Sequence, residues 1–409
     1  MPNLSQKSNV FWAYFCMSVS GFLLFAGYSI IRSSTPTLFI AAFGKENLPL
    51  AMTVMVFVTL FAVAIYSKLL TFWGARKTFH GVTIFSLFML LICYFGIKAN
   101  YPIFSAIIHI YKDVYIVLIV EQLWSFLNST VSFDMAKKYN GPLMGLMSVG
   151  PILGGQMVRI YAESVGTINL FLVTFILLIP IILVMEFAYR KCGEPQPTKK
   201  EKQAHLEGKR SDLGLDVFRE RPQLLFLLFV VLLSQMVAAT TTLRVQGFVT
   251  DVFALKDQQT AYYGQYYSII NGASAAAQFI IMPIFFSLFS IKMIHIGIPL
   301  VHLCTIGLAI VHPTLETVSL AGIVFKSFDY SLFRGAKELV YVPLSFDARY
   351  RAKEMIDVFG YRFGKGTIAG VVALGRKFAG LTEAGYSIVA LGAVGIWFLF
   401  SFKLTNPKK

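Results

Sequence analysis

Cysteine and histidine are scarce in this 409-residue chain, which has four cysteines and six histidines. Cys16, Cys93, Cys192 and Cys304 form no C-x-x-C pair and lie mostly in apolar stretches, so we expect small buried side chains rather than a disulfide framework or a redox pair. The histidines show no metal-ligand spacing. No metal site and no cofactor are therefore expected.

The sequence also lacks the motifs of phosphate-handling enzymes. The glycine-rich stretch at residues 141–155 is preceded by no strand and followed by no GKS or GKT, so it favours close helix packing over a phosphate-binding loop. Ser, His and Asp are scattered over different apolar segments, with no nucleophile and base arrangement. The chain is not expected to be an enzyme, and a membrane enzyme or receptor without transport is only the third alternative.

Charged residues make up 14% of the chain and hydrophobic residues 56%, and the mean hydropathy is +0.67. This composition is typical of a polytopic membrane protein rather than of one soluble core. A helix needs about 20 apolar residues to cross a bilayer. Twelve such segments are predicted, at residues 10–32, 48–73, 78–97, 101–133, 142–162, 167–189, 222–248, 261–290, 291–311, 314–341, 355–375 and 382–403.

The basic residues indicate how these segments are oriented. Lys and Arg in short loops stay on the cytoplasmic side, and with the N-terminus inside, the inner loops contain Lys68, Arg76 and Lys77, and later Arg349 and Arg351. Both termini are therefore predicted to be cytoplasmic, with no cleavable signal peptide and a bacterial inner membrane as the expected location. The net charge of +15 is spread over these loops, so no nucleic-acid partner is expected.

One long polar stretch divides the twelve segments into two groups of six. The N-terminal lobe is predicted at residues 1–189, a cytoplasmic linker at 190–221 and the C-terminal lobe at 222–409. Arg32 ends the first span and Arg244 ends the seventh, so both lobes begin with an arginine-terminated helix. Two parallel six-helix repeats are typical of a major-facilitator-like transporter that binds solute between them. The predicted fold class is an all-α membrane protein with two six-helix lobes.

Charged residues recur in the tenth and eleventh predicted spans, between Lys326 and Lys365. A charged side chain in hydrocarbon costs about 2.5 to 3.5 kcal/mol on insertion scales, so it normally faces a protein interior or a watery cavity. In the tenth span, positive and aromatic side chains recur every three or four residues and are spaced to share one helix face. These are Lys326, Tyr330, Arg334, Lys337 and Tyr341.

Two roles are open for these charges. In the first, cations line a cavity for a polyvalent anion and aromatic rings stack on a base; the substrate-binding candidates are Tyr28, Arg32, Glu121, Trp124, Arg244, Tyr330, Lys337, Arg362 and Lys365. In the second, charges pair with one another and hold the lobes together as gates. The candidates for gating or charge pairing are Lys326, Asp329, Arg334, Glu338 and Asp357, with Lys326 to Asp329 and Arg334 to Glu338 spaced for ion pairs within a helix.

The sequence AKELVYVPLSFDARYRAKEMIDVFGYRFGK at residues 336–365 carries a dense motif. It resembles the nucleotide transporters of obligate intracellular bacteria and plastids, the ATP/ADP translocase family, in its Lys-Glu pair, its Pro-Leu, its Ile-Asp-Val and its Gly-x-Arg-x-Gly-Lys. The Tyr-x-Ile-x-Arg pattern ending at Arg32 and the Glu-x-x-Trp at Glu121 and Trp124 add to the resemblance. Elsewhere the similarity is one of topology.

This resemblance implies exchange or import of nucleotides by alternating access, with Glu121 and Lys337 at charged positions that the family uses for transport. The chain departs from the family where Thr35 and Pro36 replace a Lys-Asp pair and where Thr240 replaces an acid. A transporter or exporter of another anionic metabolite, with or without proton coupling, is therefore the alternative. The expected partners are an anionic small molecule and the lipid bilayer, and the protein is expected to be a monomer.

Overall fold

The structure is a computed structural model that describes residues 4–194, 218, 222–341, 356, 360–361 and 364–404. Over these residues the chain is helical, with short turns and no strand. Nine helices in the described ranges are long and apolar enough to cross a membrane. The chain is thus a multi-pass all-α membrane protein, as predicted, while the count of twelve spans stays a prediction. Two candidate residues, Asp357 and Arg362, and most of the predicted linker lie outside the described residues.

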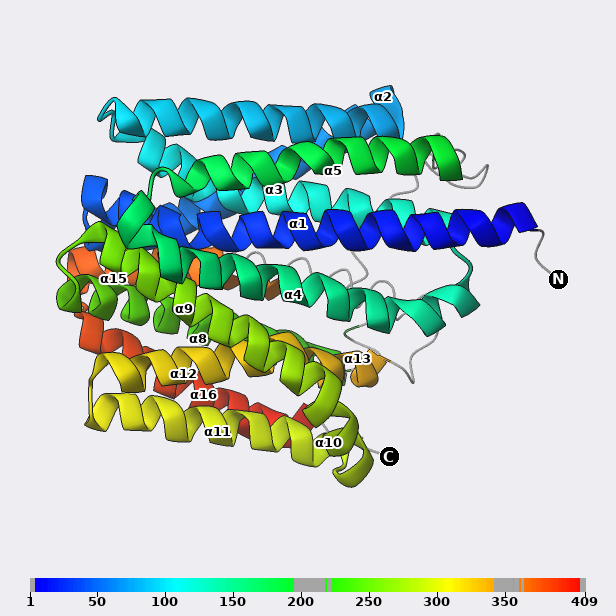
Figure 1. Cartoon of the computed structure of the whole chain (residues 1–409). Helices are drawn as coiled ribbons and strands as arrows, with labels where there is room; N and C mark the ends of the chain where they lie inside the picture. Colours follow the sequence, from blue (N-terminus) through cyan, green and yellow to red (C-terminus); the bar gives the residue numbers. More distant parts are fainter. Residues whose placement is uncertain are drawn as a thin grey trace. The chain divides into compact units, whose positions relative to one another are not determined.

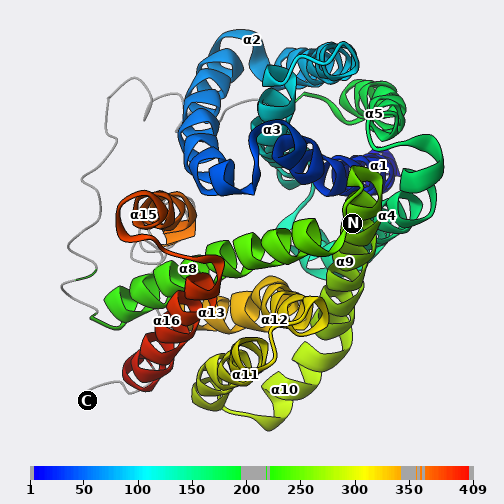
Figure 2. The same cartoon turned by 90° about the vertical axis from the view of Figure 1, so that its left-hand side faces the viewer.

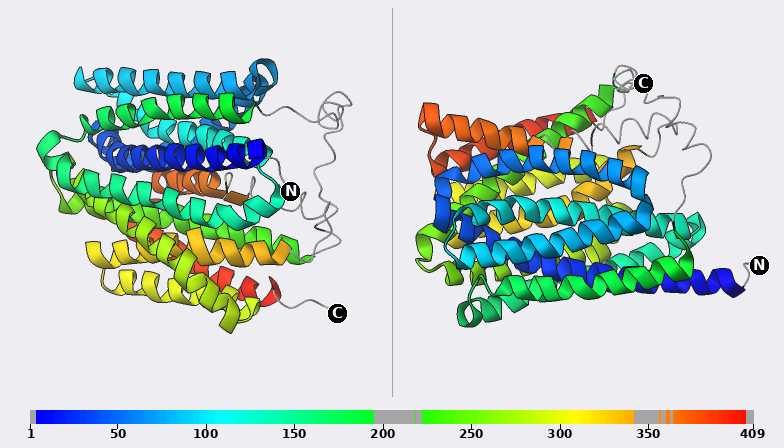
Figure 3. Two further views of the ribbon diagram at one scale, coloured as in Figure 1. Left: turned by 45° about the vertical axis from the view of Figure 1, so that its right-hand side comes forward. Right: turned by 90° about the horizontal axis from the view of Figure 1, so that it is seen from above.

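The first of two compact units contains five helices from the first half of the sequence (Figure 1). Helix α1 contacts α3, α4 and α5, and it runs side by side with α5 in the views of Figures 1 and 3. The helices are α1 (Leu4–Phe43), α2 (Leu48–Lys98), α3 (Ile103–Thr130), α4 (Phe133–Val165) and α5 (Leu170–Cys192).

The second compact unit is built on α8, which contacts α12, α15 and α16. Helix α11 packs on α12 and α16, as the end-on view in Figure 2 shows. The elements of this unit are α8 (Pro222–Val252), the π-helical segment η2 (Ala277–Ile281), α10 (Met282–Leu288), α11 (Ile291–Val311), α12 (Leu315–Phe328), the π-helical segment η3 (Asp329–Phe333), α13 (Arg334–Tyr341), α15 (Gly364–Ala379) and α16 (Glu383–Leu404).

Each unit takes a segment from the other half of the sequence. Residues Phe253–Gly272, which include most of α9 (Lys256–Ala276), belong to the first unit. Residues Lys45–Val56, which include the 3-10 turn η1 (Lys45–Asn47) and the start of α2, belong to the second. The units are therefore not contiguous stretches of sequence, and the lobe limits at 189 and 222 stay a prediction.

Helix α2 is broken at Gly74, whose φ of 76° and ψ of 174° are not helical. A positive φ of this kind is adopted readily by glycine because it has no Cβ. The Glu194 carboxylate accepts a hydrogen bond of 3.0 Å from the backbone N–H of Arg76, next to the break. The break falls between the two predicted spans that end at residue 73 and begin at residue 78.

Glycines bring α4 close to α1 in the first unit. A Cβ added at Gly150 would lie 2.3 Å from the Phe22 carbonyl oxygen, and one at Gly154 would lie 2.3 Å from the Ala26 carbonyl oxygen. These glycines serve close helix packing, as their spacing of four predicts.

The outward surface of α2 is rich in large apolar side chains. Phe57, Phe61, Phe88 and Phe95 are each more than 60% exposed. Such a surface is unfavourable in water and is expected where a helix faces lipid.

Candidate functional site

The first cluster of candidate residues surrounds Arg32 on α1. The guanidinium carbon of Arg32 lies 4.0 Å from the ring centroid of Tyr267 on α9 and 5.9 Å from that of Tyr28. Tyr267 is buried, whereas Arg32 and Tyr28 are partly exposed. A cation over an aromatic face is attracted by the ring, most strongly where water is excluded. Tyr267 thus holds the planar donor group of Arg32 in a defined orientation.

Tyr28 is anchored by a Lys-Asp pair within α3. The Tyr28 hydroxyl donates to Asp113 Oδ1 at 3.0 Å, and the Lys112 amine donates to Asp113 Oδ2 at 2.5 Å and to the His109 carbonyl at 2.8 Å. Sequence reasoning missed this pair, because neighbours in a helix are not spaced to face each other. The signal that could have found the pair is the presence of two adjacent charged residues inside the apolar segment predicted at residues 101–133.

Contacts along α9 explain why Tyr267 lies beside Arg32. Thr260 exchanges a hydrogen bond of 2.8 Å with Thr37 on α1 and accepts one of 2.9 Å from Thr167. One turn further along α9, the Gly264 carbonyl oxygen would lie 2.7 Å from a Cβ added at Gly155 on α4, so α4 and α9 approach closely. These contacts fix the turn of α9 that carries Tyr267.

The other two candidates in this unit, Glu121 and Trp124, lie further along α3. Glu121 is exposed, and Trp124 is partly buried against the core. Glu121 is eight residues beyond Asp113, which is about 12 Å along a helix axis. The cavity that would unite Glu121 with Lys337 stays a prediction.

In the second unit, two cations surround one aromatic ring. The Lys337 amine lies 4.7 Å from the ring centroid of Tyr361, and the Arg334 guanidinium carbon lies 5.8 Å from it. Arg334 is also 5.2 Å from the ring of Tyr330, one turn earlier. Three candidate residues, Tyr330, Arg334 and Lys337, thus lie together at the junction of η3 and α13, and Tyr361 between them was not predicted.

The charged residues around this junction differ in burial. Lys326, Asp329 and Lys337 are 8%, 7% and 4% exposed, whereas Arg334 and Glu338 are exposed. Buried charges of this kind are expected only where they are paired or functional. One oxygen of Asp329 has no hydrogen-bond partner among the described residues. Lys365 is partly exposed at the start of α15, and the ion pairs predicted within the tenth span stay predictions.

Arg244 lies in a separate charged cluster near the end of α8. Its Nη1 is 3.7 Å from Glu383 Oε2, and its guanidinium carbon is 4.3 Å from the Phe248 ring. The other Glu383 oxygen is 2.9 Å from the Lys45 amine, which is also 2.5 Å from Asp251. Sequence reasoning singled out none of Lys45, Asp251 and Glu383 as site residues, because all three lie at helix ends far apart in sequence.

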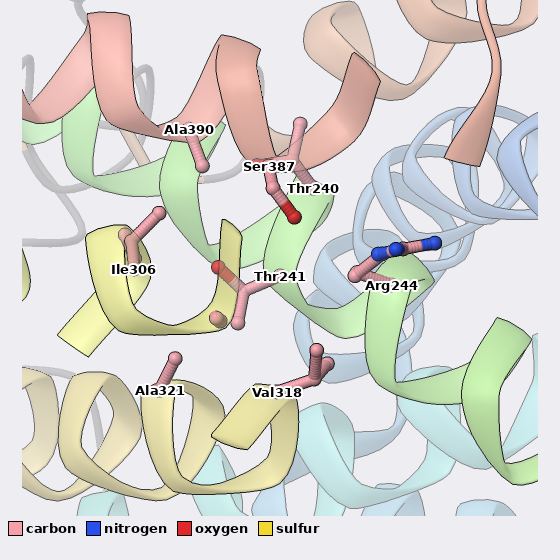
Figure 4. Close-up of a pocket in the computed structure, with 9 residues that line it drawn as sticks. Thr240, Thr241, Arg244, Ile306, Val318, Ala321, Ser387 and Ala390 are labelled. Carbon is pink, nitrogen blue, oxygen red and sulfur yellow. The ribbon is translucent and has the colours of Figure 1, made fainter. Parts of the chain in front are cut away.

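A small pocket adjoins Arg244. Figure 4 shows side chains from α8, α11, α12 and α16 around it. Its lining is mostly apolar, and the Thr241 hydroxyl has no hydrogen-bond partner among the described residues. The lining residues are Thr240, Thr241, Arg244, Ile306, Ala309, Val318, Ala321, Ser387 and Ala390.

No group of three or more His, Cys, Asp or Glu side chains in the described part of the chain is arranged to hold a metal ion. The charged clusters described above consist instead of cations, aromatic rings and one or two carboxylates. Such sets suit the recognition of anionic groups and planar rings.

Residues 268–406 match the model of a family described as the TLC ATP/ADP transporter. The chain is also similar to ADP,ATP carrier protein 3 of Rickettsia prowazekii (strain Madrid E) and of Rickettsia felis, with 43% identity over 47 residues. That match covers 12% of this chain and only 9% of each relative. The resemblance expected from residues 336–365 is therefore confirmed in the C-terminal part of the chain.

Two solved transporters resemble the whole chain in fold. The nucleoside transporter NupG superposes with a TM-score of 0.65 at 16% identity, covering 96% of this chain and 98% of that one. A D-xylose-proton symporter superposes with a TM-score of 0.68 at 12% identity, covering 98% and 99%. The fold is thus the major-facilitator-like fold that the two six-helix groups predict.

Proposed function

We propose that this chain, whose residues 268–406 match the TLC ATP/ADP transporter family, is a membrane transporter that exchanges or imports nucleotides by alternating access. Cations of the candidate set, principally Arg32 and Lys337, bind the substrate phosphates, and each of these two lies against a tyrosine ring. No covalent step is involved, so the protein is a carrier and not an enzyme.

The observation that carries this proposal is the pairing of cations with aromatic rings, around Arg32 on α1 and around Lys337 on α13. Lys337 and Arg334 lie around Tyr361, within the region that matches the transporter family. A guanidinium or ammonium group binds phosphate, and a tyrosine ring stacks on a base. A nucleotide combines both chemical groups, and a simple inorganic anion supplies only one.

A carrier of another anionic metabolite is the second candidate. Thr35, Pro36 and Thr240 stand where nucleotide transporters have charged residues, which favours a substrate with different charge. Lys112 and Asp113 on α3 form a Lys-Asp pair beside Tyr28, in place of the pair that is absent at Thr35 and Pro36 on α1. This replacement favours the nucleotide. Coupling to protons belongs to this second candidate.

Binding to the purified full-length protein tests the proposal. A ligand that binds only the folded state stabilises it by RT ln(1 + [L]/Kd), about 2.7 kcal/mol at one hundred times Kd. We expect ATP or ADP to raise the unfolding temperature, and we expect Lys337→Ala to abolish this rise. Stabilisation by organic acids but by no nucleotide would favour the second candidate.

We also propose that the protein resides in a bacterial inner membrane as a monomer with both termini in the cytoplasm. The distribution of Lys and Arg over the loops supports this orientation. Labelling of single cysteines introduced at residues 45 and 77, in intact cells and in inverted vesicles, tests it. Residue 77 is expected to react only in inverted vesicles.

A further inference from the structure

A four-residue charge cluster in the second unit surrounds Arg244, and its other three residues have no role in the proposal above. Arg244 and Asp251 lie on α8, Glu383 opens α16, and Lys45 belongs to η1. Lys45 is close to both carboxylates, at 2.5 Å from Asp251 and 2.9 Å from Glu383, whereas Arg244 approaches only Glu383. The two cations and two anions sum to zero charge.

The spacing of residues along α8 places Glu383 between Arg244 and Asp251. Arg244, Gly247 and Asp251 follow one another at helical spacing and share a face of α8. A Cβ added at Gly247 would lie 2.3 Å from Glu383 Oε2, so the carboxylate lies in the space that the glycine leaves open. Glu383 therefore occupies a space on α8 directly beside the guanidinium group.

Arg244 is incompletely satisfied by this carboxylate. At 3.7 Å, its contact with Glu383 is an ion pair that is too long for a hydrogen bond. The Arg244 side chain is only 13% exposed, and its buried Nε–H has no acceptor among the described residues. A guanidinium has five N–H donors, so Arg244 retains donors for the oxygens of a ligand.

We propose that Glu383 is a specificity-determining residue. Its carboxylate lies beside Arg244, where the anionic group of the substrate would bind, and opposes that binding. This inference rests on the proposed function and on Arg244 as one of the substrate-binding candidates of the sequence. Lys45 competes with Arg244 for the Glu383 charge and so sets how strongly the carboxylate opposes an incoming anion. Both the repulsion by Glu383 and the attraction by Arg244 and Lys45 grow with the charge of the anion, so the carboxylate affects how well anions of different charge are accepted.

Binding of inorganic pyrophosphate to the purified full-length protein tests the proposal, with the dissociation constant measured from thermal stabilisation. Glu383→Gln is expected to lower the dissociation constant about fivefold, because it removes the carboxylate that opposes the ligand. Lys45→Met is expected to raise it by a similar factor, because Glu383 then acts on Arg244 alone. Both effects are expected to vanish when Arg244→Gln is also present.

Asp251→Asn is the matched control, because Asp251 contacts Lys45 but is not in contact with Arg244 in the described structure and is 57% exposed. It is expected to change the dissociation constant less than twofold. If the cluster were only a clamp between helices, Glu383→Gln and Lys45→Met would shift binding in the same direction. That result, or no pyrophosphate binding by Glu383→Gln, would overturn the proposal.

The readout does not depend on nucleotide transport. A protein that moves no nucleotide but binds pyrophosphate with these opposite shifts would disprove the proposed function and uphold the role of Glu383. If the protein transports nucleotide but binds pyrophosphate with the same affinity as its Glu383→Gln, Lys45→Met and Asp251→Asn variants, the proposed function is upheld and the role of Glu383 is disproved.

Discussion

Arg32 and Tyr267 lie in contact, with the guanidinium carbon 4.0 Å from the ring centroid, although they stand on opposite sides of the predicted linker in the sequence. The contact exists because α9 packs on α1 and α4 within the first unit. A cation that we expect to bind phosphate is thus oriented by an aromatic ring from the other half of the chain.

Tyr267→Leu is expected to raise the KM for nucleotide about fivefold, because loss of a partly desolvated cation–π contact costs about 1 kcal/mol and frees the guanidinium to rotate. The maximal rate is expected to change less. Tyr267→Phe keeps the ring face and serves as the control. Equal losses in the two variants would show that the hydroxyl, rather than the stack on Arg32, matters.

The Lys112 and Asp113 pair predicts a strongly non-additive double-mutant cycle. The side chains are only 8% and 27% exposed, so Asp113→Asn leaves a buried ammonium without its carboxylate and is expected to cost about 3 kcal/mol of stability. The double variant Lys112→Met with Asp113→Asn is expected to regain most of this loss. Thermal unfolding in detergent measures both, and additive effects would refute the pairing.

Two glycines of α4 predict opposite outcomes for the same substitution. Gly154→Ala is expected to destabilise the fold by about 1 to 3 kcal/mol, because its Cβ would meet the Ala26 carbonyl at 2.3 Å and a backbone atom cannot move aside cheaply. Gly141 is exposed with nothing within 4 Å of an added Cβ, so Gly141→Ala is expected to be neutral or stabilising by up to about 1 kcal/mol. Matching unfolding temperatures would contradict this packing.

His302 on α11 is 1% exposed, and its ring nitrogens have no hydrogen-bond partner among the described residues. The rings of Phe325, Phe328 and Trp397 lie 5.1 to 5.7 Å from its ring. An unsatisfied buried polar group costs about 1 to 3 kcal/mol, so His302→Phe is expected to raise the unfolding temperature. His302→Ala leaves a cavity and is expected to lower it. A loss of stability in His302→Phe would reveal a polar partner for the imidazole.

The fold was predictable from the sequence because apolar runs of sufficient length determine where helices cross a membrane. Such runs predicted separate spans before and after the break at Gly74. They also predicted a span at residues 222–248, where α8 covers Pro222–Val252. The exchange of α9 into the first unit was not predictable. It depends on side-chain contacts such as that of Thr37 with Thr260, which carry no periodic signal.

The candidate site was predictable only in part. Arg32, Lys337 and Tyr330 were found because charge or aromatic character inside an apolar segment is conspicuous. Tyr267 was missed because a tyrosine among tyrosines on α9 has no distinguishing pattern. Glu383 was missed because a carboxylate at the first position of a helix is expected there for capping and dipole reasons alone.

Counterflow of labelled nucleotide in proteoliposomes tests the central claim most directly. Vesicles that contain the full chain and are loaded with unlabelled ADP are placed in labelled ATP, and internal label is followed over time. We expect uptake that requires internal nucleotide and falls at least tenfold in Lys337→Ala at equal amounts of folded protein. Label that enters no faster than into protein-free vesicles, with every nucleotide pair tried, would contradict the account.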